Sequence, residues 1–366
     1  MPAYFGSQKL GEFYFGGNKI ASAFFGSNLV YTAVQPAPAV SVWDGTYDYS
    51  WYNTTDTSFH LTTCAQFMAF AKLCNGSAGG FSQDQFGGKT IYLDASMIIN
   101  ENYSNYASWG SSPPTYSMPN TAINFNGTLD GQFHSITGAY YKNTANWGRA
   151  RLFDLNGSPK LKDLIIENYF LQGDYTSVIQ ANASTITLQG VIFRNGIVSI
   201  ANLKATEPCG PCIDIWEASS STVHTVIMSN CGAYNIKFAG NYKASGSQRE
   251  NWGTLISNSR FGTSFTNIHG VGQLTNCFVC SCSMEPGNTT TTYVKYYKIT
   301  GTSTKTITSC FEYNVKARYG SSTPSTSTPT AQGTAASSES DLITRYNNAN
   351  TLPQYTLNSD FTFRGN

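Results

Sequence analysis

Three carboxylates and a tryptophan gather within one short stretch and are the strongest candidates for enzyme chemistry. They are Glu207, Asp214 and Glu217, with Trp216 beside them. A glycan-cleaving enzyme needs two carboxyl groups about 5 to 9 Å apart. In an extended strand Asp214 and Trp216 share one face, and Glu217 lies on the other. Catalysis by this cluster is one hypothesis. Stacking of a sugar on the Trp216 ring without catalysis is a second, and ordinary solvated carboxylates are the third.

Nine cysteines, an odd number, raise the question of redox or metal chemistry. Cys209 and Cys212 form a Cys-Gly-Pro-Cys motif, but redox chemistry needs the first thiol at the start of a helix. The IDIWEASSST that follows predicts a strand and a turn instead. A zinc site is the alternative, with the candidates Cys209, Cys212, Cys277, Cys280 and Cys282. Because unpaired cysteine is commonly a buried core residue, we expect reduced thiols, no metal site and no cofactor.

A repeated strand is the element that must position these side chains. LKDLIIEN, residues 161–168, has five later copies: LQGVIFRN from Leu188, VHTVIMSN from Val223, ISNSRFGT from Ile256, LTNCFVCS from Leu274 and ITSCFEYN from Ile307. The spacing between the copies is irregular, which is typical of a structural repeat with variable loops. Strands that recur in this way predict the stacked coils of a β-solenoid.

Alignment of the copies gives residues at matching positions a common role. Four of the copies end in asparagine: Asn168, Asn195, Asn230 and Asn314. Their side-chain amides are expected to form a structural ladder of hydrogen bonds at one turn of the stack. The fourth position of each copy is expected to point into the core. It is occupied by Leu164, Val191, Val226, Ser259, Cys277 and Cys310. Stacking could also bring Asp163 and Glu167 of the first copy towards the later carboxylates.

The composition favours extended β-structure and excludes broad electrostatic binding. Charged residues make up 12% of the 366 residues, against about 25% in ordinary soluble domains, and the net charge is +1. We therefore expect no nucleic-acid partner and no attraction to an anionic membrane. The start MPAYFGSQKL has no apolar segment of a secretory signal, and nothing later reaches a membrane-spanning length. The expectation is a protein made in a cytosol, without membrane insertion.

The first forty residues contain a second repeat with a period of ten. YFGSQKLGEF, YFGGNKIASA and FFGSNLVYTA each open with two aromatics and a glycine that suits a tight turn. These repeats resemble those that start some bacteriophage tail and fibre proteins, which implies attachment to a virion through Tyr4, Phe5, Gly6, Tyr14, Phe15, Gly16, Phe24, Phe25 and Gly26. So small a unit cannot bury its aromatics alone, so it needs copies of itself or a larger partner. A hairpin folded back on the main domain is the alternative.

The next segment predicts a helix and then a sequence order that resembles a known family. Thr62 or Thr63 can begin a helix that runs to about Leu73 and ends at Asn75-Gly76, and we expect it to cap the first coil. FGGKTIYLDASMIIN and INFNGTLDGQFHSITGAYY follow. Over residues 43–141 this order resembles the opening of GLUG-type, pectate-lyase-like right-handed β-helices. The resemblance implies that Asp130-Gly131 is a turn, not an acid–base partner of His134.

The sequence therefore predicts an all-β chain, a right-handed parallel β-helix of about seven to nine coils. We divide it into an attachment segment and Pro-rich link (1–40), the β-helix (41–320), a low-complexity Ser/Thr/Pro linker (321–340) and a C-terminal tail (341–366). The tail is expected to dock on the capping helix or on a neighbouring subunit.

The functional hypothesis is a tail fibre or tailspike of a tailed phage. Such a virion protein would be anchored through residues 1–40 and would contact the host surface or its glycans. A homotrimer is implied by the resemblance alone. Alternatives are a tailspike with glycan hydrolase or lyase activity, a head fibre or decoration protein, and a bacterial adhesin.

Overall fold

The computed structural model describes the strand residues of the N-terminal segment and most of the chain from Val40 onward. The ranges after residue 39 are 40–119, 122–145, 148–182, 185–201, 209–217, 224–241, 248–261, 270–287, 294–302, 304–317 and 332–365. The chain divides into two units, Met1–Ala39 and Val40–Asn366.

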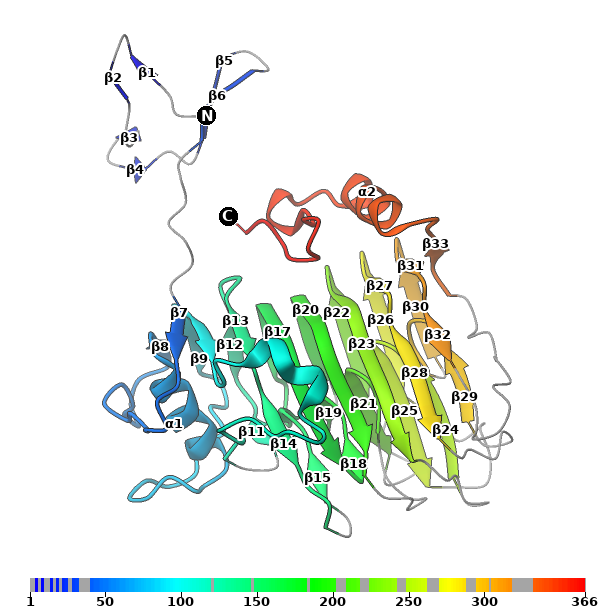
Figure 1. Cartoon of the computed structure of the whole chain (residues 1–366). Helices are drawn as coiled ribbons and strands as arrows, with labels where there is room; N and C mark the ends of the chain where they lie inside the picture. The colour runs from blue at the N-terminus through cyan, green and yellow to red at the C-terminus, as the bar shows by residue number, and fades with distance from the viewer. Residues whose placement is uncertain are drawn as a thin grey trace. The chain divides into compact units, whose positions relative to one another are not determined.

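The first unit contains three short antiparallel hairpins, one for each decapeptide (Figure 1). β1 (Tyr4–Phe5) pairs with β2 (Gln8–Lys9), and β3 (Tyr14–Phe15) pairs with β4 (Asn18–Lys19). β5 (Ser22–Phe25) pairs with β6 (Asn28–Thr32) and has one register shift. The predicted glycine turns at Gly6, Gly16 and Gly26 lie outside the described residues.

The second unit is built mostly from parallel strands. Within the described residues its long sheet contains 18 strands, all of whose pairings are parallel. They are β7 (Val40–Val42), β8 (Ser58–Leu61), β9 (Thr90–Leu93), β10 (Ser96–Ile98), β12 (Thr128–Asp130), β13 (Ser135–Thr137), β14 (Tyr140–Lys142), β17 (Lys160–Gly173), β20 (Thr185–Ile200), β22 (Thr225–Ser229), β23 (Gly232–Asn241), β26 (Val271–Thr275), β27 (Phe278–Cys280), β28 (Ser283–Gly287), β30 (Thr304–Thr308), β31 (Phe311–Tyr313), β32 (Lys316–Ala317) and β33 (Thr334–Ala335).

A second sheet of seven strands runs beside the long one. Its members are β11 (Ile123–Phe125), β16 (Phe153–Leu155), β19 (Ile179–Ala181), β21 (Ile213–Glu217), β25 (Ile256–Phe261), β24 (Gln248–Gly253) and β29 (Val294–Tyr297). Its one antiparallel pairing among the described residues joins β24 to β25. The two remaining described strands, β15 (Arg149–Ala150) and β18 (Tyr175–Thr176), pair with each other.

The chain alternates between the two sheets, so that each pass adds a strand beside the strand of the previous pass. β16, β17, β19 and β20 occur in that order along the chain, with the short β18 between β17 and β19, and β16 pairs with β19 while β17 pairs with β20. Their apolar side chains alternate along each strand and fill one continuous core, for example with Leu164, Ile166 and Ile179. A long parallel sheet of stacked strands is consistent with a parallel β-helix (Figure 1).

The predicted helix is confirmed as α1 (Cys64–Cys74). The Thr63 hydroxyl accepts a hydrogen bond from the Gln66 backbone N–H, and the Gln66 side chain accepts one from the Thr63 N–H, so both ends of a capping box are present. Asn75 ends the helix. Its buried side chains, Phe67 and Phe70 among them, belong to the same core as the first strands of the long sheet.

The register of the repeat corrects two of the six copies. Leu161 pairs with Leu188, and Leu274 pairs with Ile307, as aligned from the sequence. In the third copy Met228, not Val223, occupies the starting position, because Met228 pairs with Leu188. VHTVIMSN and the GAYN that follows it both end in asparagine after alternating apolar residues. The pattern alone therefore does not decide which of the two aligns with the end of the second copy. The fourth copy lies in the other sheet, where Ile256 pairs with Ile213.

The C-terminal segment, defined as residues 337–365, packs on the outer side of the long sheet of its own chain. It contains α2 (Glu339–Ala349) and the short 3-10 turn Pro353–Tyr355. Its apolar side chains form one cluster with residues of β17, β20, β27 and β31. The predicted docking of the tail on the capping helix is therefore replaced by docking on this sheet. Residues 318–331 lie outside the described residues.

Candidate functional site

Polar and aromatic side chains from several strands and from the C-terminal segment converge on the outer side of the long sheet. Leu164 and Ile166 point into the core, so Ile165 between them points outward. The pairing places Ile165, Ile192, Gly232, Phe278 and Phe311 side by side on five successive strands. We call the side chains of this row and their neighbour Tyr234 the outer strip: Ile165, Ile192, Tyr234, Phe278 and Phe311.

Gly232 is required by the geometry of the outer strip. A Cβ atom at this position would lie 2.1 Å from Cζ of Phe278. The Phe278 ring therefore occupies the space over the glycine. The same ring contacts Tyr346 and Phe361 of the C-terminal segment.

The C-terminal segment covers the outer strip with aromatic contacts. The Tyr346 ring meets Phe278 at a centroid distance of 5.4 Å and Phe311 at 6.4 Å. The Phe361 ring stacks on Tyr234 at 4.1 Å with an interplanar angle of 10°. Offset and edge-on aromatic pairs of this kind add about 0.5–1.5 kcal/mol to the burial of their area.

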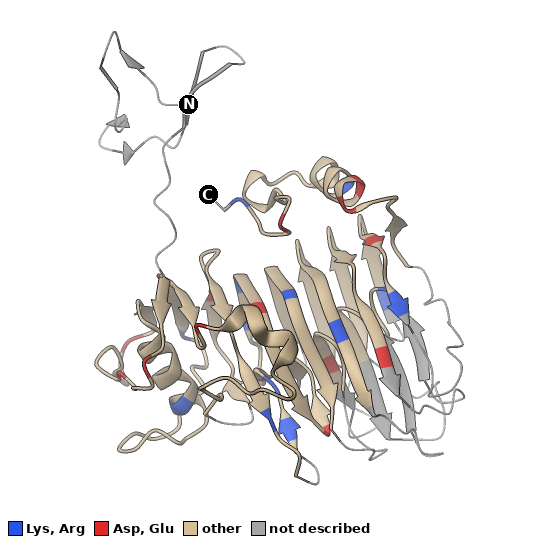
Figure 2. Ribbon diagram, in the orientation of Figure 1, with Lys and Arg blue, Asp and Glu red and all other residues tan. Residues whose placement is uncertain are grey.

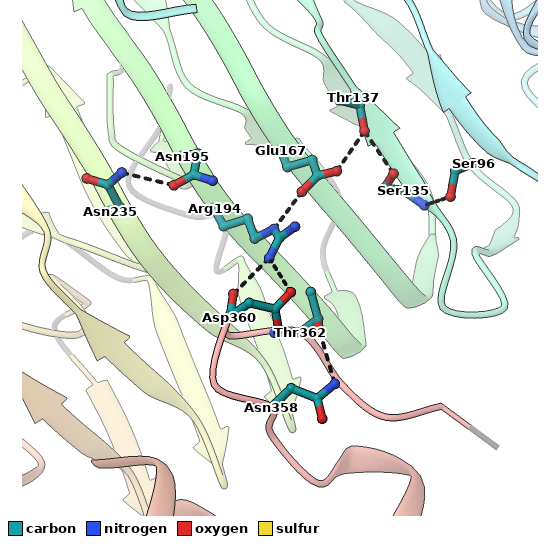
Figure 3. A network of polar contacts seen from close by, with 10 residues as sticks. All are labelled: Ser96, Ser135, Thr137, Glu167, Arg194, Asn195, Asn235, Asn358, Asp360 and Thr362. Atoms are coloured by element: carbon teal, nitrogen blue, oxygen red, sulfur yellow. Dashed lines mark hydrogen bonds and ion pairs between the residues drawn. The ribbon is translucent and has the colours of Figure 1, made fainter. Parts of the chain in front are cut away.

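A chain of polar contacts crosses the same surface (Figure 3). Ser135 and Thr137 share a hydrogen bond of 2.8 Å between their hydroxyls, and the Thr137 hydroxyl donates to Glu167 at 2.9 Å. Arg194 Nε donates to the other Glu167 oxygen at 2.5 Å, and Arg194 Nη1 donates to the backbone carbonyl and the carboxylate of Asp360 at 2.7 and 3.2 Å. The contacts therefore link β13, β17 and β20 to the C-terminal segment.

Asp163 anchors the far end of the segment. The Tyr355 hydroxyl donates a buried hydrogen bond of 2.7 Å to Asp163 Oδ1, and Lys162 Nζ lies 3.2 Å from Oδ2. Burial raises the pKa of Asp163 above its ordinary value, although Tyr355 and Lys162 oppose that shift. Burial together with the Asp163 hydrogen bond also raises the pKa of Tyr355. The raised pKa of Tyr355 keeps the proton on its hydroxyl, where it can donate to Asp163.

Sequence reasoning missed this site, although one signal was present. Glu167 and Arg194 occupy matching positions in the first and second copies of the repeat, and opposite charges at facing positions of neighbouring strands attract. Nothing comparable marks Tyr355 or Asp360, because their partners are 192 and 166 residues away in sequence.

The predicted asparagine ladder corresponds to one of two rows of residues with positive φ. Asn168, Asn195, Asn235, Ser281 and Asn314 form one row, with φ between 50° and 53°. Side-chain hydrogen bonds join Asn235 to Asn195 at 2.9 Å and Asn314 to Ser281 at 3.4 Å. Asn230 belongs to the other row, with Asp163, Gly190, Asn276 and Ser309. Asparagine tolerates this left-handed conformation better than most residues, which suits it to such turns.

The predicted carboxylate cluster is described only in part. Asp214 lies on β21 and is fully buried between Gln180 and Ser257 of the neighbouring strands. Gln180 Nε2 donates to the Asp214 carbonyl at 3.2 Å. Glu207 lies outside the described residues, and so do the side chains of Trp216 and Glu217. Of this cluster, the described geometry therefore gives one buried carboxylate, Asp214.

All nine cysteines are buried thiols that form no disulfide. Cys231, Cys277 and Cys310 are neighbours in one core row that continues Leu164 and Val191. Burial raises the thiol pKa of Cys212, the direction opposite to that of a redox thiol. Among the residues that the structure describes, no three His, Cys, Asp or Glu side chains are grouped to hold a metal ion. Over the same residues no helix is long and apolar enough to span a membrane.

An open cavity of about 560 Å³ lies near the start of the second unit. Its lining residues are Val42, Trp43, Asp44, Asn100, Glu101, Asn102, Thr115 and Tyr116. The Trp43 and Tyr116 rings pack at 4.6 Å, and Asn100 is held by hydrogen bonds to the backbone of Tyr116 and Gly138. Asp44, Glu101 and Asn102 are exposed at its rim. The cavity thus combines an aromatic wall with carboxylates and an amide.

Charged side chains are sparse over the described sheets, as Figure 2 shows.

No family model matches the chain, and neither a curated protein nor a solved structure shows significant similarity to it.

Proposed function

We propose that this chain is a fibre or tailspike protein of a tailed-phage virion, anchored by its N-terminal unit and contacting host surface glycans through its body. In this proposal the body is a right-handed parallel β-helix and the assembly is a homotrimer. The observation that carries the proposal is the combination of three hairpins at ten-residue spacing with a separate body of stacked parallel strands.

The hairpins support a role in attachment. An isolated two-stranded hairpin is marginally stable in water, and these hairpins have strands of two to five residues. Each brings an aromatic pair, Tyr4–Phe5, Tyr14–Phe15 or Phe24–Phe25. A partner surface that receives the aromatics would complete the unit, which is the behaviour expected of an anchor.

The body supports contact with glycans without cleavage. Asp214 is fully buried, so it is poorly placed to reach a polysaccharide. The cavity beside Trp43 and Glu101 offers an aromatic wall and exposed hydrogen-bonding groups, which suit a hydroxyl-rich sugar. A depolymerase would need two facing carboxylates in a groove, and release of reducing ends from host polysaccharide by the purified chain would favour that alternative.

The proposal is tested on particles. Immunogold labelling of purified virions with an antibody against the body is expected to decorate the tail. Light scattering of the purified chain is expected to give three times the 39.8 kDa chain mass. Label on the head would favour a head fibre or decoration protein, and absence from particles would reject a virion protein altogether.

A further inference from the structure

We propose that the C-terminal segment is a strap that ties non-adjacent repeats of the long sheet together and makes their unfolding one cooperative event. In stacked-repeat proteins each repeat contacts only its neighbours, so stability is a sum of local terms and repeats can open separately. A segment that runs across the repeats adds contacts of another kind, because its release affects all of them at once.

The contacts of the segment extend over six successive strands. β13, β17, β20, β23, β27 and β31 pair in that order along the long sheet. The segment starts at the β31 end, directly after Ala336, whose N–H donates to the Glu312 carbonyl at 2.9 Å, and its Tyr346 ring meets Phe311. It reaches the other end at Tyr355, whose ring meets Phe133, the residue two before β13, at 6.0 Å, and the residues after Tyr355 contact the strands between the two ends.

The two ends are joined by contacts of different chemistry. Phe361 covers Tyr234 of β23 and Phe278 of β27, with centroid distances of 4.1 and 5.7 Å. Asp360 accepts from Arg194 of β20, and Arg194 in turn donates to Glu167 of β17 (Figure 3). One short piece of chain therefore contacts strands that do not pair with one another.

The link to Glu167 extends the coupling beyond the residues that the segment touches. Glu167 is 9% exposed and receives both Arg194 and Thr137. The carboxylate would lose one of its donors if the segment left and Arg194 turned towards solvent. Unpaired buried charge is costly, so displacement of the segment also weakens the contact between β13 and β17.

The test is hydrogen exchange of backbone amides in the full-length chain, followed by mass spectrometry. Phe361→Ala removes the central aromatic contact of the segment. We expect at least about tenfold faster exchange in β13 and in β31 together, the two ends of the strap. Leu352→Ala is the matched control on the segment itself, because Leu352 is 41% exposed, and it is expected to leave exchange unchanged.

A second control separates coupling from general loss of stability. Val198→Ala creates a cavity in the core of β20 without touching the segment, and it is expected to speed exchange mainly in the strands beside β20. If Phe361→Ala instead speeds exchange only in β23 and β27, next to its own ring, the strap does not couple the repeats. If the variant fails to fold, Tyr355→Phe loosens the segment at Asp163, and unchanged exchange in the distant strands β27 and β31 would overturn the proposal.

Discussion

At the scale of single residues, matching positions in the repeat predicted the burial of some side chains but not of others. Cys277 and Cys310 were assigned to the core because their neighbours in the repeat are apolar, and both are buried. Asp214 gave no such indication, because an aspartate in a strand usually faces solvent. Its full burial depends on what covers the second sheet, which a local pattern does not contain.

Two tyrosines of the C-terminal segment provide a matched pair for testing buried hydroxyls. The Tyr355 hydroxyl donates to buried Asp163, whereas the Tyr346 hydroxyl is buried with no hydrogen-bond partner among the described residues. We expect Tyr355→Phe to lower the free energy of unfolding by about 1–3 kcal/mol, and Tyr346→Phe to leave it equal or raise it by about 1 kcal/mol. Chemical denaturation of both variants measures the difference, and equal losses would contradict the assigned contacts.

Asp84 gives a prediction for the pH dependence of stability. Burial acts to raise its pKa, but Lys89 Nζ at 2.6 Å, the Phe86 N–H at 2.8 Å and the Tyr52 hydroxyl at 3.0 Å together hold the pKa below the ordinary value of 3.8. Since the folded pKa is depressed, the stability contributed by Asp84 is present above pH 3.8 and is lost as the pH falls through the folded pKa.

The experiment compares unfolding free energies between about pH 5 and pH 2 for the wild type and Asp84→Asn. We expect the wild type to lose its advantage over the variant as the pH falls below the ordinary value. Two curves that run parallel over the whole range would show that the carboxylate contributes nothing that depends on its charge.

At the scale of elements, the sequence predicted an element correctly where all the residues that fix its position lie in one short stretch. The start of α1 was predicted to within one residue because Thr62 and Thr63, both suitable N-cap residues, directly precede the apolar run. The structure identifies Thr63 as the cap and adds Gln66, which completes a capping box. The register of the third repeat failed because two consecutive stretches, ending at Asn230 and Asn235, carry the same pattern. Both stretches pair with β20, the first along Thr185–Gln189 and the second from Ile192 onward, and the stretch itself does not decide which part of β20 it faces.

The cap of α1 is testable with a conservative control. Thr63→Ala removes the side-chain oxygen that accepts from the Gln66 N–H, and we expect it to lower the free energy of unfolding by about 1 kcal/mol. Thr63→Ser keeps an equivalent oxygen and should retain most of that stability. Thermal or chemical denaturation distinguishes them. A serine variant as unstable as the alanine variant would assign the effect to the lost methyl group instead.

At the scale of the whole molecule, the sequence could predict stacked parallel strands but not what runs across them. Repetition identifies the sheets, since each copy is a strand with the same alternation. The docking of the C-terminal segment depends on contacts between residues far apart in sequence, such as Tyr355 with Asp163, and no periodicity indicates them. The same holds for the proposed glycan cavity, whose lining comes from three separate stretches of residues 42–116.

We propose that the N-terminal hairpins attach this chain to a virion, and incorporation of a shortened chain into particles tests this proposal. Particles are assembled with the full-length chain or with a chain lacking residues 1–33, purified on a density gradient and probed by immunoblot for the body. Both chains should be folded in the lysate, as judged by equal resistance to protease. We expect the full-length chain to sediment with particles and the shortened chain to stay in the soluble fraction. Equal incorporation of the two chains would contradict it.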